Sequence, residues 1–193
     1  MLQSVIFDMD GVIVDSEQMH ADANAIALVP YGLTMPAEYY LSYAGTSKYR
    51  MMEILIEKHH LNATADELCR AADRENDVIF ERDGFREVPG VVNLIKMLSN
   101  EGISLAIASS SPYEDIYKVT DYFDIRKYFD VMVSGFNGNI NPKPAPDIYN
   151  LALKKLGFTP EASIAIEDTD TGLLAAHRAL LTCIGYRNPL SGN

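Results

Sequence analysis

The sequence predicts an α/β fold, in which a parallel β-sheet core carries an inserted all-helical domain. Short apolar segments, typical of buried parallel strands, recur along the chain. They alternate with helical patterns, and such alternation builds a parallel sheet with helices on both faces. Residues 17–86 interrupt the alternation, because they contain helical patterns only. We therefore expect one sheet domain and one helical domain.

Each predicted strand is a short apolar run, and each later strand is reached through a predicted helix. The expected strands are Leu2–Phe7, Ser104–Ala108, Val131–Ser134, Ser163–Ile166 and Leu181–Tyr186. The expected helices of the sheet domain are Val91–Ser99, Tyr113–Thr120, Asp147–Leu156 and Gly172–Ala179. Helical crossovers of this kind place successive strands parallel to one another.

The inserted segment is predicted to form a small helical cap domain. Its helices are expected at Glu17–Leu28, Ala37–Tyr43, Lys48–His60 and Ala65–Arg82. Thr64 and Glu67, three residues apart, have the pattern of a capping box that begins the last of these helices. We expect residues 1–16 and 87–193 to form the core and residues 17–86 to form the cap.

The composition limits the partners of the chain. Its 193 residues suffice for one α/β core and a small insertion, and 27 acidic against 16 basic side chains give a net charge of -11. Because no Lys/Arg-rich run is present, we expect neither nucleic acid nor a membrane surface as a partner. No signal-peptide pattern or membrane-spanning run is visible. We expect a soluble, cytoplasmic protein, and by default a monomer.

Two aspartates follow the first predicted strand at once, in the run Asp8-Met9-Asp10-Gly11. Like charges this close repel, so each carboxylate is costly to ionise unless a cation or a proton accompanies it. Carboxylate oxygens suit Mg2+. The alternative is that Asp8 and Asp10 merely open a turn, since Asp-Gly is a common turn signal. The residues that follow the other strands favour the metal site.

Polar residues also follow three other predicted strands. Ser109 and Ser110 come after the second strand, Lys143 lies in the loop after the third, and Glu167 and Asp168 come after the fourth. Open α/β sheets bind ligands beyond the carboxyl ends of their strands. The sequence therefore predicts that these residues share one crevice with the two aspartates, and that the crevice suits a metal and a phosphate group.

The segment after the second strand also predicts where a helix begins. Ser111-Pro112-Tyr113-Glu114 has the pattern of a Ser N-cap, a Pro at the first helical position and a Glu at the third. Backbone N–H groups at such a helix start attract anions. We expect the Ser109 hydroxyl and the Ser110 amide to bind a phosphoryl oxygen, and Ser111 to cap the helix.

Lys143 and the acids after the fourth strand each have a role in this prediction. Lys143 stands among prolines that fix its loop, so it can bridge a nucleophilic carboxylate and a phosphoryl oxygen; the alternative is a solvated surface lysine. We expect Asp168 to bind the metal directly and Glu167 to contact it through water. Asp170 is expected to begin the next helix, because an acid favours the positive end of the helix dipole.

Taken together, these motifs resemble a known family. Asp8-Met9-Asp10-Gly11, Ser109, Lys143 and Glu167-Asp168 resemble the four motifs of the haloacid dehalogenase superfamily, in order and at fitting separations. The helical insertion resembles the cap of its β-phosphoglucomutase-like branch. Further segments that fit this branch are Asp15–His20, Gly45–Ser47, Lys143–Asp147 and Glu167–Gly172. The resemblance implies a Rossmann-like core, Mg2+ as cofactor and a small phosphorylated metabolite as substrate.

The resemblance also implies phosphoryl transfer through an aspartyl-phosphate. Asp8 is the implied nucleophile, and Asp10 is the acid that protonates the leaving alkoxide and then the base that activates water. The implied metal ligands are Asp8, Asp10, Glu167 and Asp168. The implied phosphate-binding residues are Ser109, Ser110 and Lys143. The candidate cap and substrate residues are His20, Gly45, Ser47, Lys48 and Arg50.

Two departures from the branch leave alternatives open. In its mutases an Arg follows the Gly-x-Ser segment of the cap and holds a second phosphate, whereas this chain has Lys48 there and Arg50 two places on. A lysine cannot reproduce the planar clamp of an arginine. Members of the branch also continue past the last strand with a further strand and helix, so either this chain is truncated or its sheet edge is incomplete.

A phosphomonoester hydrolase is therefore the first expectation and a hexose-phosphate mutase the second. Dehalogenases of the superfamily lack the second acid, because halide leaves without a proton. A third interpretation is a Mg2+- or phosphate-binding module without activity. Intact Asp8, Asp10, Lys143 and Asp168 argue against that module, and the sequence does not identify the substrate.

Overall fold

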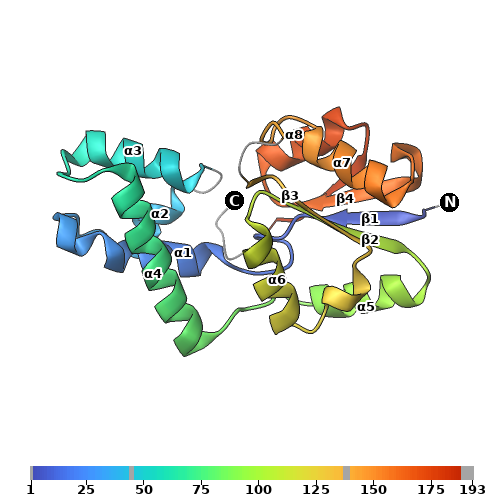
Figure 1. Ribbon diagram of the computed structural model, residues 1–193, viewed down its shortest axis with the longest axis horizontal. Coiled ribbons are helices and arrows are strands. Elements are labelled where there is room, and N and C mark those ends of the chain that lie inside the picture. The colour runs from blue at the N-terminus through green and yellow to red at the C-terminus, as the bar shows by residue number, and fades with distance from the viewer. Residues whose placement is uncertain (1, 44–45, 137–139, 188–193) are drawn as a thin grey trace. The chain divides into compact units, whose positions relative to one another are not determined.

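The computed structural model describes residues 2–43, 46–136 and 140–187. The chain divides into two compact units, which we call the sheet unit and the helical unit (Figure 1). Within the described residues, the sheet unit contains the chain up to Asp15 and from Arg86 onward, and the helical unit contains Ser16–Phe85. The two segments at which the chain leaves and re-enters the sheet unit are paired, because the Asp15 amide donates to the Arg86 carbonyl at 2.8 Å.

A parallel sheet forms the centre of the sheet unit, so the predicted α/β fold is confirmed. The five strands of the described residues are β1 (Ser4–Phe7), β2 (Ser104–Ser109), β3 (Val131–Ser134), β4 (Ser163–Glu167) and β5 (Thr182–Gly185). Their order is β3-β2-β1-β4-β5, and every neighbouring pair is parallel. The central strand β1 is wholly buried, and its Phe7 is in register with Ile107 and Ile166. Strands buried on both faces read as continuous apolar runs, which is why the sequence pattern located them.

Helices cover both faces of this sheet, with α7 and α8 on one face and α5 and α6 on the other (Figure 1). Their bounds are Val91–Asn100 for α5, Tyr113–Tyr122 for α6, Asp147–Leu156 for α7 and Asp170–Arg178 for α8. Helix α8 begins two residues earlier than the apolar pattern suggested, because Thr169 accepts a hydrogen bond from the Gly172 amide at 3.1 Å and so caps it. Asp170 is the first residue of α8, as predicted.

The helical unit contains helices only, among the residues that the structure describes. They are α1 (Glu17–Ala27), α2 (Ala37–Leu41), α3 (Lys48–His59) and α4 (Ala65–Asp83), with a short 3-10 turn, η1, at Val29–Tyr31. A core of its own includes Leu28, Met52, Leu55 and Leu68, each of them fully buried. None of the helices in the described part of the chain is long and apolar enough to cross a lipid bilayer.

The capping box predicted at Thr64 is confirmed. Thr64 accepts from the Glu67 amide at 3.3 Å, and the Glu67 carboxylate accepts from the Thr64 amide at 2.8 Å. Two donors that a helix start would leave unsatisfied are thereby paired. This box begins α4, the longest helix of the helical unit among those described.

Replacing Thr64 by alanine should lower the free energy of unfolding by about 1 kcal/mol, because the N-cap acceptor is lost. Urea denaturation followed by circular dichroism measures the change. Thr64→Ser keeps the hydroxyl and is the matched control. Equal stability of Thr64→Ala and the wild type would show that the box does not contribute.

Candidate active site

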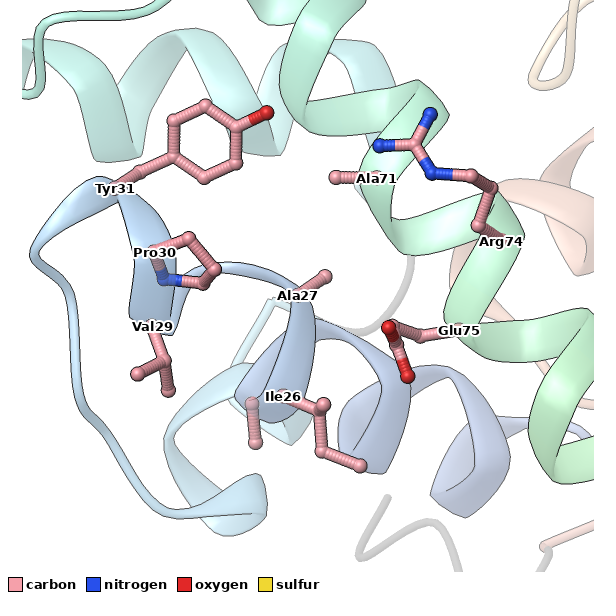
Figure 2. A pocket seen from close by; sticks show the side chains of 9 residues that line it. Ile26, Ala27, Val29, Pro30, Tyr31, Ala71, Arg74 and Glu75 are labelled. Atoms are coloured by element: carbon pink, nitrogen blue, oxygen red, sulfur yellow. The ribbon is translucent and has the colours of Figure 1, made fainter.

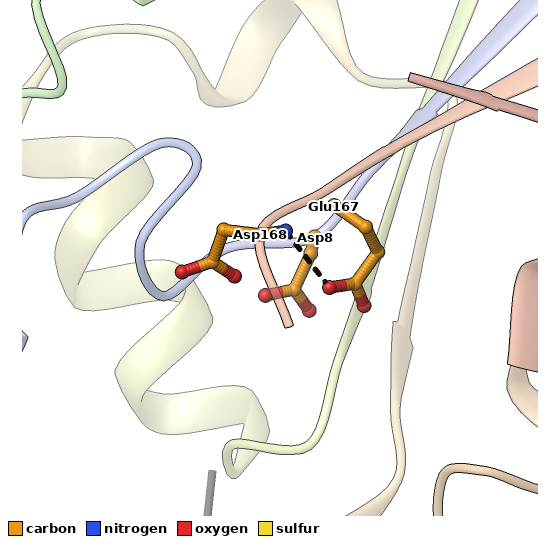
Figure 3. A group of neighbouring side chains, drawn as sticks. All are labelled: Asp8, Glu167 and Asp168. Carbon is orange, nitrogen blue, oxygen red and sulfur yellow. Dashed lines mark hydrogen bonds between the residues drawn. The ribbon is translucent and has the colours of Figure 1, made fainter. Parts of the chain in front are cut away.

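Three carboxylates of the sheet unit meet where β1 and β4 end. These strands are neighbours, although the chain leaves β1 toward β2 and leaves β4 toward β5. Such a reversal of strand order opens a crevice at the carboxyl ends of the strands. Asp8 follows β1, Glu167 ends β4 and Asp168 comes next. One oxygen from each of these carboxylates lies within 4.8 Å of the other two (Figure 3).

Two glycines allow the backbone to approach these carboxylates closely. A Cβ atom on Gly11 would lie 1.9 Å from Asp168 Oδ2, and a Cβ atom on Gly172 would lie 1.8 Å from Glu167 Oε1. Gly11 also has a φ of 78°, in the left-handed region that favours glycine. Both positions therefore require glycine while the acids occupy these places.

Lys143 connects two of the carboxylates. Its Nζ donates to Asp8 Oδ1 at 2.6 Å, to Glu167 Oε1 at 2.5 Å and to the Ala108 carbonyl at 3.2 Å. An ammonium group has three protons, so these contacts fix its orientation. The side chain is 9% exposed, which is not the environment of a solvated surface lysine. Burial acts to lower the pKa of Lys143, but Asp8 and Glu167 outweigh it and raise the pKa, so the ammonium stays charged.

Asp8 lies in an environment that disfavours a negative charge. Burial raises the pKa of Asp8 to about 8; Lys143 opposes the increase, while Glu167 and Asp10 add to it. The carboxylates in effect share the positive charge of one lysine. A cation bound beside Asp8 would act in the opposite direction, because positive charge favours the ionised carboxylate.

Glu167 is fully buried and accepts hydrogen bonds from five donors. Its Oε1 accepts from Lys143 and from the Tyr149 hydroxyl, at 2.5 and 2.9 Å. Its Oε2 accepts from the Asp168 amide and from both the amide and the hydroxyl of Thr169, at 3.1 to 3.2 Å. This carboxylate therefore holds Lys143 and the start of α8 in place. A contact from Glu167 to a metal through water stays a prediction.

Tyr149 is a site residue that the sequence analysis missed. Burial raises the pKa of its hydroxyl far above the ordinary value, with Glu167 and Asp8 adding to the effect, so the hydroxyl stays protonated and donates to Glu167. The sequence predicted the helix that contains Tyr149, but neither the burial of this side chain nor its polar partner. The hydroxyl of a buried tyrosine normally has a hydrogen-bond partner, and this rule could have indicated a polar contact for Tyr149.

Asp10 and the serines after β2 form a second group. Ser111 Oγ donates to Asp10 Oδ2 at 2.7 Å, and the Ser111 amide donates to Ser109 Oγ at 3.0 Å. The prediction that Ser111 caps α6 is wrong, because the cap residue is Pro112 and no side chain bonds the helix start. The carboxylate of Asp10, a charged acceptor, binds the Ser111 hydroxyl instead. Ser109 is buried and Ser110 is exposed.

The residues present fit a hard divalent cation such as Mg2+. Asp8, Glu167 and Asp168 offer oxygen donors only, and Mg2+ prefers oxygen ligands. With Lys143 counted, these four side chains carry two formal negative charges in excess, which a divalent cation would neutralise. The carboxylate of Asp10 is not part of this group, so its role as a metal ligand stays a prediction.

The candidate residues of the helical unit have their own local partners. Ser47 accepts from the Arg50 amide at 3.3 Å and caps α3, and the Arg50 guanidinium pairs with Glu53 at 2.9 Å. Lys48 forms an ion pair with Asp73 of α4. The remaining candidates are His20, whose Nδ1 lies 3.2 Å from Asn76 Oδ1, and Gly45, which lies outside the described residues.

The helical unit also contains a pocket of about 600 Å³ between the end of α1, the turn η1 and α4 (Figure 2). Ile26 and Val29 line one side of it, and Arg74 and Glu75 of α4 line the other. Its lining is mostly apolar. The carboxylates of the sheet unit do not contribute to it.

The chain is similar to known hydrolases and to solved structures. The family model described as haloacid dehalogenase-like hydrolase matches residues 5–186. A phosphorylated carbohydrates phosphatase of Thermotoga maritima is 31% identical over 178 residues, which cover 92% of this chain and 82% of that protein. The crystal structure of CbbY from Rhodobacter sphaeroides in complex with phosphate has a TM-score of 0.82 and 26% identity, and the match covers 96% of this chain and 86% of that one.

A β-phosphoglucomutase is also among the similar structures. The protein from Clostridium difficile has a TM-score of 0.75 and 26% identity, with 96% of this chain and 84% of that chain covered. The family match begins within β1 and ends just past β5, so it takes in both units. The resemblance predicted from the four motifs is confirmed, and the chain belongs to the haloacid dehalogenase-like hydrolase family as an enzyme of the phosphatase kind.

Proposed function

We propose that the chain is a Mg2+-dependent phosphatase that hydrolyses a small phosphomonoester through an aspartyl-phosphate. The contact between Lys143 and Asp8, 2.6 Å long and almost wholly buried, carries the proposal. It sets a charged ammonium beside a carboxylate at the carboxyl end of the sheet. A carboxylate can attack the anionic phosphoryl group only where such positive charge offsets the repulsion.

Asp8 and Asp10 perform the bond changes. An oxygen of Asp8 forms a bond to phosphorus while the bond from phosphorus to the ester oxygen breaks, and Asp10 transfers its proton to that oxygen so that an alcohol leaves. Asp10 then takes a proton from water. The water oxygen forms a bond to phosphorus as the bond to Asp8 breaks, which releases phosphate and restores both side chains.

Lys143 and Ser109 hold the transferring group. The Lys143 ammonium is fixed by its partners and can share a proton with a phosphoryl oxygen next to Asp8. Ser109 Oγ accepts from the Ser111 amide, so its own proton is directed to a further acceptor, for which a phosphoryl oxygen is suited. The Ser110 amide, at an exposed residue before α6, is the third expected contact.

Asp8 and Asp168 are the residues we expect to hold Mg2+, with Glu167 beside them. When bound, the ion supplies positive charge that offsets the charge developing on the phosphoryl group. Glu167 contributes chiefly by fixing Lys143, since five donors occupy its oxygens.

A sugar phosphate or a similar metabolite is the proposed substrate. One relative is named as a phosphatase of phosphorylated carbohydrates, and another as a fructose-1-phosphate phosphatase from Escherichia coli. The acidic chain needs a local cationic site for such an anion, and Lys143 supplies it. A cytoplasmic location and a monomeric state stay predictions.

A hexose-phosphate mutase is the second candidate, because a β-phosphoglucomutase is among the similar structures. Lys48 stands where the mutases of the branch carry an arginine, which weighs against this candidate. We expect phosphate release from a sugar monophosphate without any bisphosphate. Interconversion of hexose phosphates that begins only after a hexose bisphosphate is added, with little phosphate released, would establish the mutase instead.

Asp8→Asn should abolish phosphate release, by about a thousandfold or more, because an amide is a poor nucleophile. The measurement is phosphate released from a panel of sugar phosphates with Mg2+, and a chelator should also stop the wild type. Asp124→Asn is the matched control: Asp124 is exposed, and its φ of 52° is one that asparagine tolerates. Similar turnover by the two variants would contradict the role of Asp8.

Mg2+ should bind more tightly as the pH rises toward about 8, because below that pH a proton competes for Asp8. Each pH unit below this value should weaken the apparent affinity by up to about tenfold, and the dependence should level off above it. Calorimetric titration with Mg2+ at several pH values tests this. Asp8→Asn should lose the dependence, and a constant wild-type affinity would contradict the elevated pKa.

A further inference from the structure

Three serines connect Asp10 to the ends of β2 and β3; we call Ser109, Ser111 and Ser134 the serine network. Ser111 Oγ donates to Asp10 Oδ2 at 2.7 Å, and the Ser111 amide donates to Ser109 Oγ at 3.0 Å. Ser134 Oγ donates to the Ser111 carbonyl at 2.7 Å and accepts from the Phe136 amide at 3.2 Å. Ser111 is thus fixed through its amide, its carbonyl and its hydroxyl.

The ends of β2 and β3 are also joined directly, which makes Ser111 a rigid support. The Gly135 amide donates to the Ser109 carbonyl at 2.8 Å, next to the pairing of Ser109 with Ser134 in the sheet. Ser111 therefore does not depend on its own short loop for its position. The hydroxyl that reaches Asp10 is fixed by hydrogen bonds that lead back to the sheet.

The contact makes the two oxygens of Asp10 different. Because Oδ2 accepts a hydrogen bond from the Ser111 hydroxyl, rotation of the carboxyl group would break that bond. In the proposed reaction, Oδ1 is then the oxygen that we expect to carry the transferred proton.

We propose that Ser111 is a positioning residue that fixes the carboxyl group of Asp10 for proton transfer. This inference rests on the proposed phosphatase function. In the first step the proton moves from Asp10 Oδ1 to the ester oxygen as that oxygen leaves phosphorus. In the second step a water proton moves to Oδ1 as the water oxygen bonds to phosphorus. The Ser111 proton stays on Oγ throughout.

The choice of leaving group tests this role. A sugar or glycerol phosphate releases an alkoxide that needs a proton, whereas p-nitrophenyl phosphate releases a phenolate that leaves without one. Ser111→Ala should lower kcat/KM for the alkyl substrate by about tenfold to a hundredfold, the size expected for the loss of one hydrogen bond to a group that becomes charged in the transition state. For the aryl substrate kcat/KM should fall less than about threefold. The ratio kcat/KM reports the first phosphoryl transfer, whereas kcat also contains the hydrolysis of the aspartyl-phosphate, in which Asp10 acts for both substrates.

Three further variants make the result specific. Asp10→Asn should show the same preference for the aryl substrate, but more strongly. Ser111→Thr keeps the hydroxyl and should restore most of the alkyl activity. Ser99→Ala is the control, because Ser99 lies in α5 before β2, at the amino end of the sheet and away from Asp10. This variant should match the wild type on both substrates.

The outcomes separate this inference from the proposed function. Equal losses of kcat/KM on both substrates in Ser111→Ala, or no loss, would overturn the positioning role while leaving the phosphatase intact. Failure of Ser111→Thr to recover activity, with the variant folded by circular dichroism, would also overturn it. If the wild type releases no phosphate from either substrate, the proposed function fails, and the role of Ser111 fails with it.

Discussion

The rest of the sheet unit depends on a buried charge cluster in which Lys143 joins Asp8 to Glu167, with Asp168 beside them. The side chains of Lys143, Asp8 and Glu167 are 9%, 10% and 0% exposed. Unpaired buried charges cost several kcal/mol, so each must be matched by an opposite charge or by hydrogen bonds. Glu167 is matched by five donors, and the three carboxylates together with Lys143 have two formal negative charges in excess. The cluster is therefore suited to a bound divalent cation.

This requirement explains several residues that apolar packing alone would not select. Gly11 and Gly172 are needed because any side chain there would overlap a carboxylate oxygen. Tyr149 lies on the buried face of α7, where a phenylalanine would fill the same space, yet its hydroxyl supplies a donor to Glu167. Deleting one partner of a buried charged network leaves the others unsatisfied, so these positions are coupled to the chemistry although they bind no substrate.

The sequence predicted the sheet, its helices and most of the residues that gather at its carboxyl edge. It did so because buried strands give continuous apolar runs and because charged residues directly after such strands have few structural uses. The sequence did not predict the hydrogen-bond partners of some polar side chains. Ser111 has the pattern of a helix cap, but its hydroxyl donates to Asp10, which is distant in the sequence, and does not bond the start of α6. A carboxylate is a stronger acceptor than an uncharged group. Tyr149 was missed for a similar reason, because periodicity reports burial and not hydrogen bonding.

The two units differ in how firmly their polar side chains are fixed. Asp8, Glu167 and Lys143 are buried and joined by hydrogen bonds, so contacts within the protein set their geometry. Lys48 and Asp73 are 36% and 56% exposed, and an ion pair at that exposure contributes about 0 to 1 kcal/mol. This ion pair can therefore be lost at little cost. The contacts that hold the buried cluster are thus expensive to change, whereas the exposed ion pair of the helical unit contributes little to stability.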